Sequence, residues 1–375
     1  MTHRLAVVDN VGRRAGMDYY DISLLRSLAR RGSRCSLFSN FTERDAEIEY
    51  RPYFDARASG TLSKGLDFFR GYVRSFRDCR RDGTDAVILH LFSTSWEHVS
   101  KVILAKLFRL RLILIVHDIS SFGRRDSPLG RRFIFHRLAD AVVVHNRFSY
   151  DRLSELLTPA VMRKVHIIRH GNYLFFPLET VSKQAAAQRL GLDPEFFYLL
   201  FFGQIKRVKG LDTLLAALPQ VDMRARLIIA GRPWKDDFRR YQNLIDRLSI
   251  GERVIPIIRF VTDEEKNLLF SLCDAVVLPY RLIFQSGVLL MAMSYGRAVV
   301  ASDIPGNSEV VREGENGLLF PAGDEAALAR QVNRLVRNEK LVARLSIVAE
   351  RTARKEYAWE DIAASYLEVL DGIVV

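Results

Sequence analysis

Short runs of apolar residues recur along the first half of the chain, separated by stretches whose apolar residues have helical spacing. The runs are at residues 5–8, 35–38, 86–89, 112–116 and 141–144. Strands that are apolar throughout, separated by amphipathic helices, are typical of a parallel sheet covered on both faces. This half is therefore predicted to be a doubly wound α/β domain.

The same alternation starts again after a strand predicted at residues 165–168. The further strands are predicted at 197–202, 227–230, 254–258, 275–278 and 298–301, and the helices at 211–218, 325–337, 340–353 and 359–370. Such a repeat indicates two Rossmann-like domains, over residues 1–175 and 176–356, with a final helix over 357–375. A cleft between the two domains is the default binding site.

The composition fits this architecture and excludes other classes. With 375 residues, 49% of them hydrophobic, the chain can bury two cores and is too apolar for a disordered protein. No apolar run approaches the roughly 18 residues that cross a bilayer, so neither a signal peptide nor a spanning helix is expected. Cys35, Cys79 and Cys273 are far apart and predict no disulfide and no zinc site, which suits a cytoplasmic setting.

The net charge of +12 is distributed unevenly. Residues 1–180 contain 30 Lys and Arg against 19 Asp and Glu, whereas residues 181–375 contain 26 against 25. The first half therefore carries an excess of 11 positive charges. This asymmetry indicates an anionic partner for that half, which could be nucleic acid, a membrane surface or a phosphorylated ligand.

Two glycine-containing turns follow predicted strands of the second half. Residues 203–210 combine Gly203 and Gly210 with a cluster of three cations, and residues 285–288 place Ser286 as an N-cap before the amides of Gly287 and Val288. Open α/β sheets bind ligands at the carboxyl ends of their strands, where amides and a helix N-terminus attract phosphate. The alternatives are a solvated basic turn and an ordinary helix cap.

These turns are part of a series of segments that resembles the GT4 glycosyltransferases, which have the GT-B fold. The match covers about residues 197–325, with a looser fit over the N-terminal half, in the segments 203–215, 274–281, 285–289, 296–303, 306–311 and 315–319. The resemblance implies an α/β GT-B fold, with two Rossmann-like domains facing a central cleft. It also implies that the C-terminal helix crosses back to the N-terminal domain.

The resemblance further implies a nucleotide-sugar donor on the C-terminal domain and an acceptor on the N-terminal domain. Lys209 would contact the donor diphosphate, assisted by Lys206 or Arg207, and the amides of Gly287 and Val288 would hold its distal phosphate. The other implied donor-binding residues are Gly203, Tyr280, Gln285 and Ser286, with Arg259, Phe260 and Val261 facing the nucleobase. No metal ion and no cofactor are expected, because cations and helix dipoles replace a divalent ion.

Two positions depart from the family pattern. Gln204 stands where most members have arginine, and Ile283 and Met291 stand where most have two glutamates, the later of which contacts the ribose. A branch of the family with a Gln-Ser-Gly loop lacks this pair. The residue that binds the ribose is therefore unassigned, and an inactive homologue that still binds sugar nucleotide is an alternative.

Candidate catalytic residues lie in the N-terminal half. His117 ends a strand and resembles the family's active-site histidine; it could donate to the transferred sugar or take the acceptor proton, with Asp118 orienting it. In the loop after the first strand, Gly12 permits close approach to a ligand. Asp18 is either a general base or, as we prefer, the N-cap of the next helix.

Two basic stretches of the same half suit an anionic membrane. Residues 64–81 form an amphipathic helix with arginines on its flank. A second cluster combines three aromatic or aliphatic residues with arginines, namely Phe133, Ile134 and Phe135 with Arg124, Arg125, Arg131, Arg132 and Arg137. Each nearby cation contributes about 1 kcal/mol to binding of anionic lipid. The alternative for both stretches is a helix that packs one face on the core and exposes its basic face to solvent.

The sequence thus predicts a hexosyltransferase-type glycosyltransferase of polysaccharide or glycoconjugate biosynthesis, retaining and metal-independent. It would act on a glycan or lipid-linked acceptor, in the cytoplasm and peripherally on the inner face of the membrane. A nucleotide-sugar epimerase is a second alternative, although no extra carboxylates stand out for it. Nucleic acid is not expected as a partner, since no recognition helix or stacking platform is evident.

Overall fold

The computed structural model describes residues 2–12, 16–42, 46–54, 61–119, 127–234 and 237–374, except for the side chains of residues 61–64. The chain forms two compact units. The first unit contains residues 1–171 and 358–375, and the second contains residues 172–357. Each unit is built on one parallel sheet, as the repeated pattern of apolar runs predicts.

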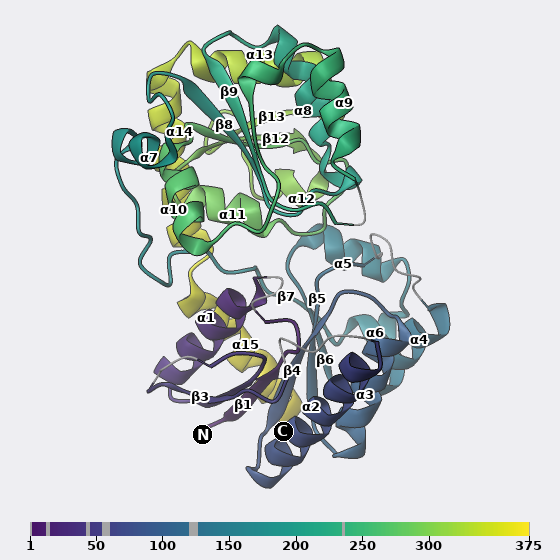
Figure 1. Cartoon of the computed structure of the whole chain (residues 1–375). Coiled ribbons are helices and arrows are strands. Elements are labelled where there is room, and N and C mark those ends of the chain that lie inside the picture. The colour runs from purple at the N-terminus through teal and green to yellow at the C-terminus, as the bar shows by residue number, and fades with distance from the viewer. Residues whose placement is uncertain are drawn as a thin grey trace. The chain divides into compact units, whose positions relative to one another are not determined.

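The first unit has a seven-stranded parallel sheet in the order β3-β2-β1-β4-β5-β6-β7 (Figure 1). Its strands are β1 Arg4–Val8, β2 Arg34–Phe38, β3 Ile48–Arg51, β4 Ala86–Leu91, β5 Leu112–Val116, β6 Ala141–Val144 and β7 Val165–Ile167. Its helices are α1 Met17–Arg30, α2 Thr61–Arg81, α3 Trp96–Leu107, α4 Pro128–Phe133, the π-helical turn η2 Ile134–Leu138, α5 Arg147–Ser154, α6 Pro159–Met162 and α15 Trp359–Val374. Helices α1 and α15 pack on each other, and so do α2 and α3.

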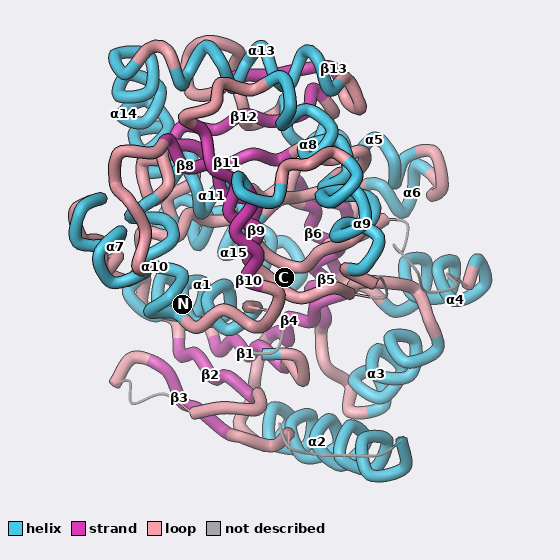
Figure 2. The backbone as a smooth tube through the Cα atoms, turned by 45° about the horizontal axis from the view of Figure 1, so that its top comes forward, coloured by secondary structure: helices cyan, strands magenta, loops and turns pink. Residues whose placement is uncertain are grey.

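The second unit has a six-stranded parallel sheet in the order β10-β9-β8-β11-β12-β13 (Figure 2). Its strands are β8 Phe197–Phe202, β9 Ala225–Ala230, β10 Val254–Ile257, β11 Ala275–Leu278, β12 Ala298–Asp303 and β13 Leu318–Pro321. Its helices are α7 Lys183–Leu190, α8 Leu211–Ala217, α9 Arg239–Arg247, α10 Asp263–Leu272, α11 Gly287–Ser294, α12 Pro305–Ser308, α13 Glu325–Val336 and α14 Glu339–Glu356, with 3₁₀ turns η3 Arg207–Lys209, η4 Leu218–Gln220 and η5 Gly251–Arg253.

Strand β8 shows why these strands are apolar throughout. Leu199 and Phe201 belong to a core beneath α8, α9 and α13, whereas Tyr198 and Leu200 belong to a second core beneath α7, α10, α11 and α14. Successive side chains of a strand point to opposite faces, so a sheet covered on both faces leaves no position for a polar residue along the strand. Polar chemistry is therefore confined to the strand ends.

The C-terminal helix α15 packs in the first unit, as the resemblance implies. Its first residue, Trp359, is buried, and its ring lies 5.0 Å from the ring of Tyr20 on α1. The hydroxyls of Tyr20 and Tyr366 are 2.9 Å apart. A Cβ at Gly171 would lie 2.1 Å from the Trp359 ring, so only glycine leaves room for the indole at this point.

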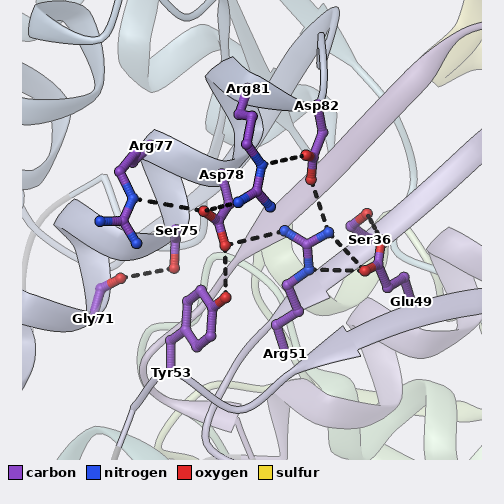
Figure 3. Close-up of polar contacts among 10 residues, drawn as sticks. All are labelled: Ser36, Glu49, Arg51, Tyr53, Gly71, Ser75, Arg77, Asp78, Arg81 and Asp82. Carbon is purple, nitrogen blue, oxygen red and sulfur yellow. Dashed lines mark hydrogen bonds and ion pairs between the residues drawn. The ribbon is translucent and has the colours of Figure 1, made fainter.

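A compact ion network fastens α2 to the edge of the first sheet (Figure 3). Asp78 on α2 is almost fully buried; its Oδ2 accepts from the Arg51 guanidinium at 3.2 Å and from the Tyr53 hydroxyl at 2.6 Å. The same guanidinium also pairs with Glu49 and Asp82 at 2.6 and 2.8 Å. Removing Asp78 would leave the Arg51 guanidinium paired with Glu49 and Asp82 and would leave the Tyr53 hydroxyl without its acceptor.

We expect Asp78→Ala to lower the free energy of unfolding by about 2 kcal/mol, because the Arg51 guanidinium and the Tyr53 hydroxyl each lose a hydrogen-bond acceptor. Arg80→Ala on the same helix changes an exposed side chain and should stay within about 0.5 kcal/mol of the parent. Urea denaturation followed by circular dichroism measures both variants. Equal stabilities for the two would show that the network contributes nothing.

Some elements and side chains were not anticipated by the pattern. Strands β3 and β13 and helices α9 and α10 were missed, and residues 183–190, expected only as a Gln/Ala segment, form helix α7. Helix α2 is amphipathic as predicted, but Leu66 and Phe69 are exposed and its buried face is carried by Tyr72 and Phe76. Both missed strands are edge strands of only four residues, and β3 is also half polar whereas β13 ends in proline, so each has a weak sequence signal.

The three cysteines are free and buried. Burial raises the pKa of each thiol, Cys35, Cys79 and Cys273, to about 12. The thiolate is the nucleophile and the metal ligand, so these side chains are inert packing residues at neutral pH.

Candidate functional site

A tight loop joins β8 to α8 at the carboxyl edge of the second sheet. Gly203 and Gly210 at its two ends have positive φ angles of 94° and 65°. A Cβ at Gly210 would lie 1.9 Å from the Pro279 carbonyl oxygen, and the Arg281 amide donates to the Val208 carbonyl at 2.7 Å. The loop is thus held directly against the segment that follows β11, and both glycines are required by the backbone.

A third glycine, Gly231, completes this backbone packing. It follows β9 with a φ of 146°, and a Cβ there would lie 1.9 Å from the Gly203 carbonyl oxygen. The Gly203 amide in turn donates to the Ala230 carbonyl at 2.9 Å. The ends of β8 and β9 therefore touch through backbone alone, which leaves the space beside Gly203 for other groups.

Two of the three predicted cations meet at this loop. The Lys209 Nζ lies 5.3 Å from the Tyr280 ring centroid, and the Lys206 Nζ lies 4.4 Å above the Trp234 ring. Burial, together with the charge of Lys206, lowers the pKa of Lys209 to about 7. The Arg207 side chain is exposed, so Lys206 is the better placed of the two candidate assistants.

The N-terminus of α11 lies at the same place. Ser286 is its N-cap, as predicted, and accepts from the Leu289 amide at 3.2 Å. The structure assigns the Gly287 and Val288 amides no acceptor among the described residues, and a Cβ at Gly203 would lie 3.3 Å from the Lys209 Nζ and 3.5 Å from a Val288 methyl. Ammonium group and helix N-terminus therefore converge on Gly203, which makes an anion-binding corner.

The remaining predicted donor-site residues differ in their burial and in their partners. Tyr280 is buried beneath Lys209, and Gln285 is half-buried beside the cap. Arg259 forms a two-pronged ion pair with Glu265, the residue that completes the capping box of α10. Phe260 is 62% exposed and Val261 is half-buried, directly after β10. The positions Ile283 and Met291 pack as half-buried apolar residues and offer no carboxylate.

The loop after β1 in the first unit differs from the prediction for Asp18. Helix α1 has Gly16 as its N-cap, at a φ of 70°, and Asp18 lies in the first helical turn. The preferred assignment of Asp18 as N-cap is therefore wrong, because glycine is the residue that tolerates the left-handed conformation needed there. Gly12 is buried, and its amide donates to Asp9 at 2.6 Å. Residues 13–15 of this loop lie outside the described residues.

His117 lies just beyond β5, at the carboxyl edge of the first sheet, within a group of imidazoles. Its Nε2 is 2.8 Å from the Nδ1 of His90, and its ring lies 5.3 Å from that of His145. His170 is 5.4 Å from His145, and Tyr20 contacts all four rings at 5.0 to 6.2 Å. Of these four histidines, His117 was singled out from the sequence, and their association was not predicted.

Burial keeps this group uncharged. It lowers the pKa of His90 and of His170 to about 4 and that of His145 to about 3, and it lowers the pKa of His117 well below its usual range. The neighbouring imidazoles and Lys101 add to the effect at His117. Within the described ranges, no three His, Cys, Asp or Glu side chains are arranged to hold a metal ion. Asp118 is half-buried, and its orienting role stays a prediction, since the partner that the structure provides for His117 is His90.

Several residues of the two sites were not found from the sequence. Gly231 and Trp234 follow β9, a loop without a recognisable motif, and Tyr173 places its hydroxyl 2.8 Å from where a Gly287 Cβ would be. Asp21 lies within an amphipathic helix and reaches His90 at 2.7 Å. Only the tertiary structure brings these side chains to the strand ends.

Comparisons with known proteins agree with this architecture. The sucrose-phosphate synthase from Thermosynechococcus elongatus superposes with a TM-score of 0.78 at 19% identity, covering 99% of both chains. The Anabaena HepE protein, solved in complex with UDP and glucose, superposes with a TM-score of 0.75 at 20% identity, covering 99% of this chain and all of that one. Two parallel-sheet Rossmann-like units with these neighbours define the GT-B fold.

The sequence comparisons then give the family. Residues 197–338 match the model of the glycosyl transferases group 1 family. Over 96% of its length, the chain is 25% identical to the D-inositol 3-phosphate glycosyltransferase of Xylanimonas cellulosilytica, covering 92% of that protein. Residues 197–338 thus form a glycosyl transferases group 1 domain, which makes the protein a glycosyltransferase-type enzyme and confirms the GT4 resemblance of these motifs.

The backbone contact at Gly210 can be tested directly. Gly210→Ala should lower the free energy of unfolding by about 2 to 4 kcal/mol, because it adds both an unfavourable φ and a clash with the Pro279 carbonyl. Gly251→Ala is the matched control: nothing lies within 4 Å of its Cβ position, so a change of less than about 0.5 kcal/mol is expected. Thermal unfolding measures the stability of both variants. An equal decrease in stability for the two would show that the backbone contact at Gly210 does not require glycine.

Proposed function

We propose that this enzyme transfers a hexose from a nucleoside-diphosphate sugar to a glycan or lipid-linked acceptor, with retention of configuration and without a metal ion or other cofactor. In the reaction, the bond between the anomeric carbon and the diphosphate oxygen breaks, and a bond to an acceptor hydroxyl oxygen forms. The nucleoside diphosphate leaves with the bonding electrons, and one of its oxygens takes the proton of the acceptor hydroxyl. The second unit binds the donor, and the first unit, with His117, binds the acceptor.

The observation that carries the donor assignment is the convergence at Gly203 of the Lys209 ammonium group and the N-terminus of α11. Negative charge develops on the departing diphosphate, and preorganised donors aimed at such charge are the largest single source of stabilisation in many enzymes. Lys206 adds a second cation beside the first. The UDP bound by the Anabaena neighbour has the ligand chemistry that these groups suit.

The roles that we propose for the remaining donor-binding residues follow from their places in the fold. Phe260 offers an exposed aromatic face after β10 for a nucleobase, and the adjacent backbone up to Val261 could hydrogen-bond its edge. Gln285 and Ser286 hold the turn that presents the α11 amides. Neither Ile283 nor Met291 can bind a ribose hydroxyl, so the ribose contact must come from elsewhere in the loop.

Lys209→Met should lower kcat/KM for transfer by about 10²- to 10³-fold, because it removes a half-buried cation that faces the charge developing on the leaving group. Lys340→Met removes an exposed lysine of the same unit and should leave the rate unchanged. The assay follows nucleotide release and the product anomer with a panel of UDP- and GDP-sugars, with and without EDTA. Donor binding without turnover across the panel would favour the inactive-homologue alternative.

The lowered pKa of Lys209 provides a second test of the proposed contact between Lys209 and the donor diphosphate. An anionic ligand favours the charged ammonium, so UDP should raise the pKa of Lys209 and bind with uptake of nearly one proton at pH 8. The uptake should vanish below about pH 6, where Lys209 is already charged. Titration calorimetry in buffers of different ionisation enthalpy measures this number, and uptake that persists in Lys209→Met would refute the assignment.

We further propose that the first unit docks on an anionic membrane through the groove between α3 and α4–η2. The groove has a volume of about 540 Å³ and contains Trp96, Leu129 and Phe133, which are 70%, 77% and 44% exposed. Arg132, His136 and Arg137 line it as well. Exposed aromatic and aliphatic side chains beside cations suit the boundary between headgroups and acyl chains.

Not all of the predicted basic cluster takes part in this surface. Ile134 and Phe135 are buried in the core, and Arg124 and Arg125 lie outside the described residues. On α2, Leu66 and Phe69 are exposed together with Arg70 and Arg74 and could contribute to docking. No described helix is long and apolar enough to cross a membrane.

The double variant Leu129→Ser/Phe133→Ser should bind vesicles of 30% phosphatidylglycerol about tenfold more weakly, since it removes two exposed apolar side chains. Leu107→Ser is the control, because Leu107 is 74% exposed on α3 but does not line the groove. Vesicle sedimentation at two salt concentrations measures the binding. Association that depends neither on these residues nor on phosphatidylglycerol would refute docking at the groove.

A further inference from the structure

A chain of short polar contacts runs from His117 into the interior of the first unit. The Nε2 of His117 lies 2.8 Å from the Nδ1 of His90 on β4, and the Nε2 of His90 lies 2.7 Å from the Oδ1 of Asp21 on α1. Asp21 and His90 are fully buried, whereas His117 is only half-buried. The chain therefore leads from a buried carboxyl group to an imidazole that can meet a ligand.

The rings in this chain have little freedom. His117 stacks on Phe92 with centroids 4.7 Å apart and ring planes within 14°, and its amide donates to the Leu91 carbonyl at 2.9 Å. The edge of Tyr20 packs on both imidazoles. No described residue offers the Nδ1 of His117 a hydrogen-bond partner. Since its Nε2 is occupied by His90, Nδ1 is the atom available to a substrate.

Each neutral imidazole carries one proton, so the state of Asp21 sets the direction of both hydrogen bonds. A carboxylate at Asp21 would accept from His90 Nε2; His117 would then donate from Nε2 and leave a lone pair on Nδ1. A neutral carboxyl group at Asp21 would donate to His90 Nε2. His90 would then donate from Nδ1 to His117, and His117 would carry its proton on Nδ1.

The surroundings favour the neutral carboxyl group. The Oδ2 of Asp21 is buried and accepts no hydrogen bond from an amide, hydroxyl or cation of the described residues; its polar neighbour is the Asp9 carboxyl group, and two adjacent buried carboxylates would be costly. Asp9 and Asp18 lie near it, and Asp9 already holds two amides, those of Val11 and Gly12, at 2.9 and 2.6 Å. Of the two buried carboxyl groups, Asp9 is thus the better stabilised anion, and Asp21 keeps the proton.

The other groups that face the chain of contacts agree with neutral imidazoles. Lys101 donates to the His90 carbonyl at 2.7 Å and places a cation beside both rings. His145 and His170 each have Nδ1 beside a backbone carbonyl, at 2.9 and 2.7 Å, so they too carry a proton on Nδ1. A further positive charge on His117 would be repelled by Lys101 and poorly solvated.

We propose that Asp21 and His90 are positioning residues that hold His117 as a neutral imidazole and present its Nδ1–H as a donor to an oxygen of the substrate. Of the two roles open to His117, the geometry thus selects hydrogen-bond donor and not general base. The part that concerns the substrate rests on the proposed function. The tautomer of His117 does not, and it can be measured without any ligand.

The first test is nuclear magnetic resonance of the full chain with ¹⁵N-labelled histidine, with His117→Gln to assign the signal. Two-bond proton–nitrogen correlations at pH 7 should show His117 protonated on Nδ1 only. In Asp21→Leu, which has no polar group, the signal should become a mixture of tautomers. A proton on Nε2, an imidazolium, or an unchanged signal in Asp21→Leu would each overturn the inference.

The second test uses the conservative variant. The side-chain amide of Asp21→Asn can donate to His90 as a neutral carboxyl group does, so it should restore the Nδ1–H tautomer and recover kcat to within about threefold of the parent. Asp21→Leu should lower kcat by about 10- to 100-fold with little change in KM. If Asp21→Asn instead moves the proton to Nε2 and is as slow as Asp21→Leu, Asp21 is a carboxylate and the inference is wrong.

The two proposals fail separately in these experiments. If no nucleotide sugar is turned over by the parent chain, the proposed function fails, while the tautomer measurement still decides the roles of Asp21 and His90. If transfer is observed with the proton of His117 on Nε2, the proposed function stands and the positioning proposal fails.

Discussion

Burial of both faces of each sheet is the constraint on which the sites depend. Strands such as β5 and β8 have apolar side chains on either side, so a polar group within them would lose its hydration without compensation. Along such central strands, polar residues lie at the strand ends, and the carboxyl ends of all strands of a parallel sheet lie at the same edge. The histidines of the first unit and the glycine-rich loop of the second unit are therefore gathered at such edges.

The two sites differ in charge: the site of the second unit is positive, and that of the first unit is neutral. In the second unit, Gly203, Gly210 and Gly231 let backbone segments touch, and the space left beside them is faced by an ammonium group and a helix N-terminus. That corner is positive and suits a diphosphate. In the first unit, burial disfavours charge on four imidazoles and on Asp21. The result is a neutral network, and the direction of its hydrogen bonds sets which nitrogen of His117 carries the proton.

The errors of prediction have a common physical origin. Asp18 has the residue type of an N-cap, but Gly16 occupies that position because the chain enters α1 through a left-handed conformation. Leu66 and Phe69 have the right spacing for a buried stripe, yet the buried residues among the described part of α2 lie between Gly71 and Cys79. His117 was predicted at a strand end, but its contact with His90, and that of His90 with Asp21, were not. In each case the missing information was which surface the residue faces.

The sequence by itself determined the two parallel sheets, their strand ends, the cap at Ser286 and the family, because apolar runs and glycine turns are local features with local causes. Only the tertiary structure decided that Lys209 lies half-buried beside Gly203 and that Asp21, His90 and His117 form one chain of contacts. Asp21 and His117 are nearly a hundred residues apart. Neither the distance between their side chains nor their loss of water can be read from residue types, since both arise only when α1 packs on the sheet.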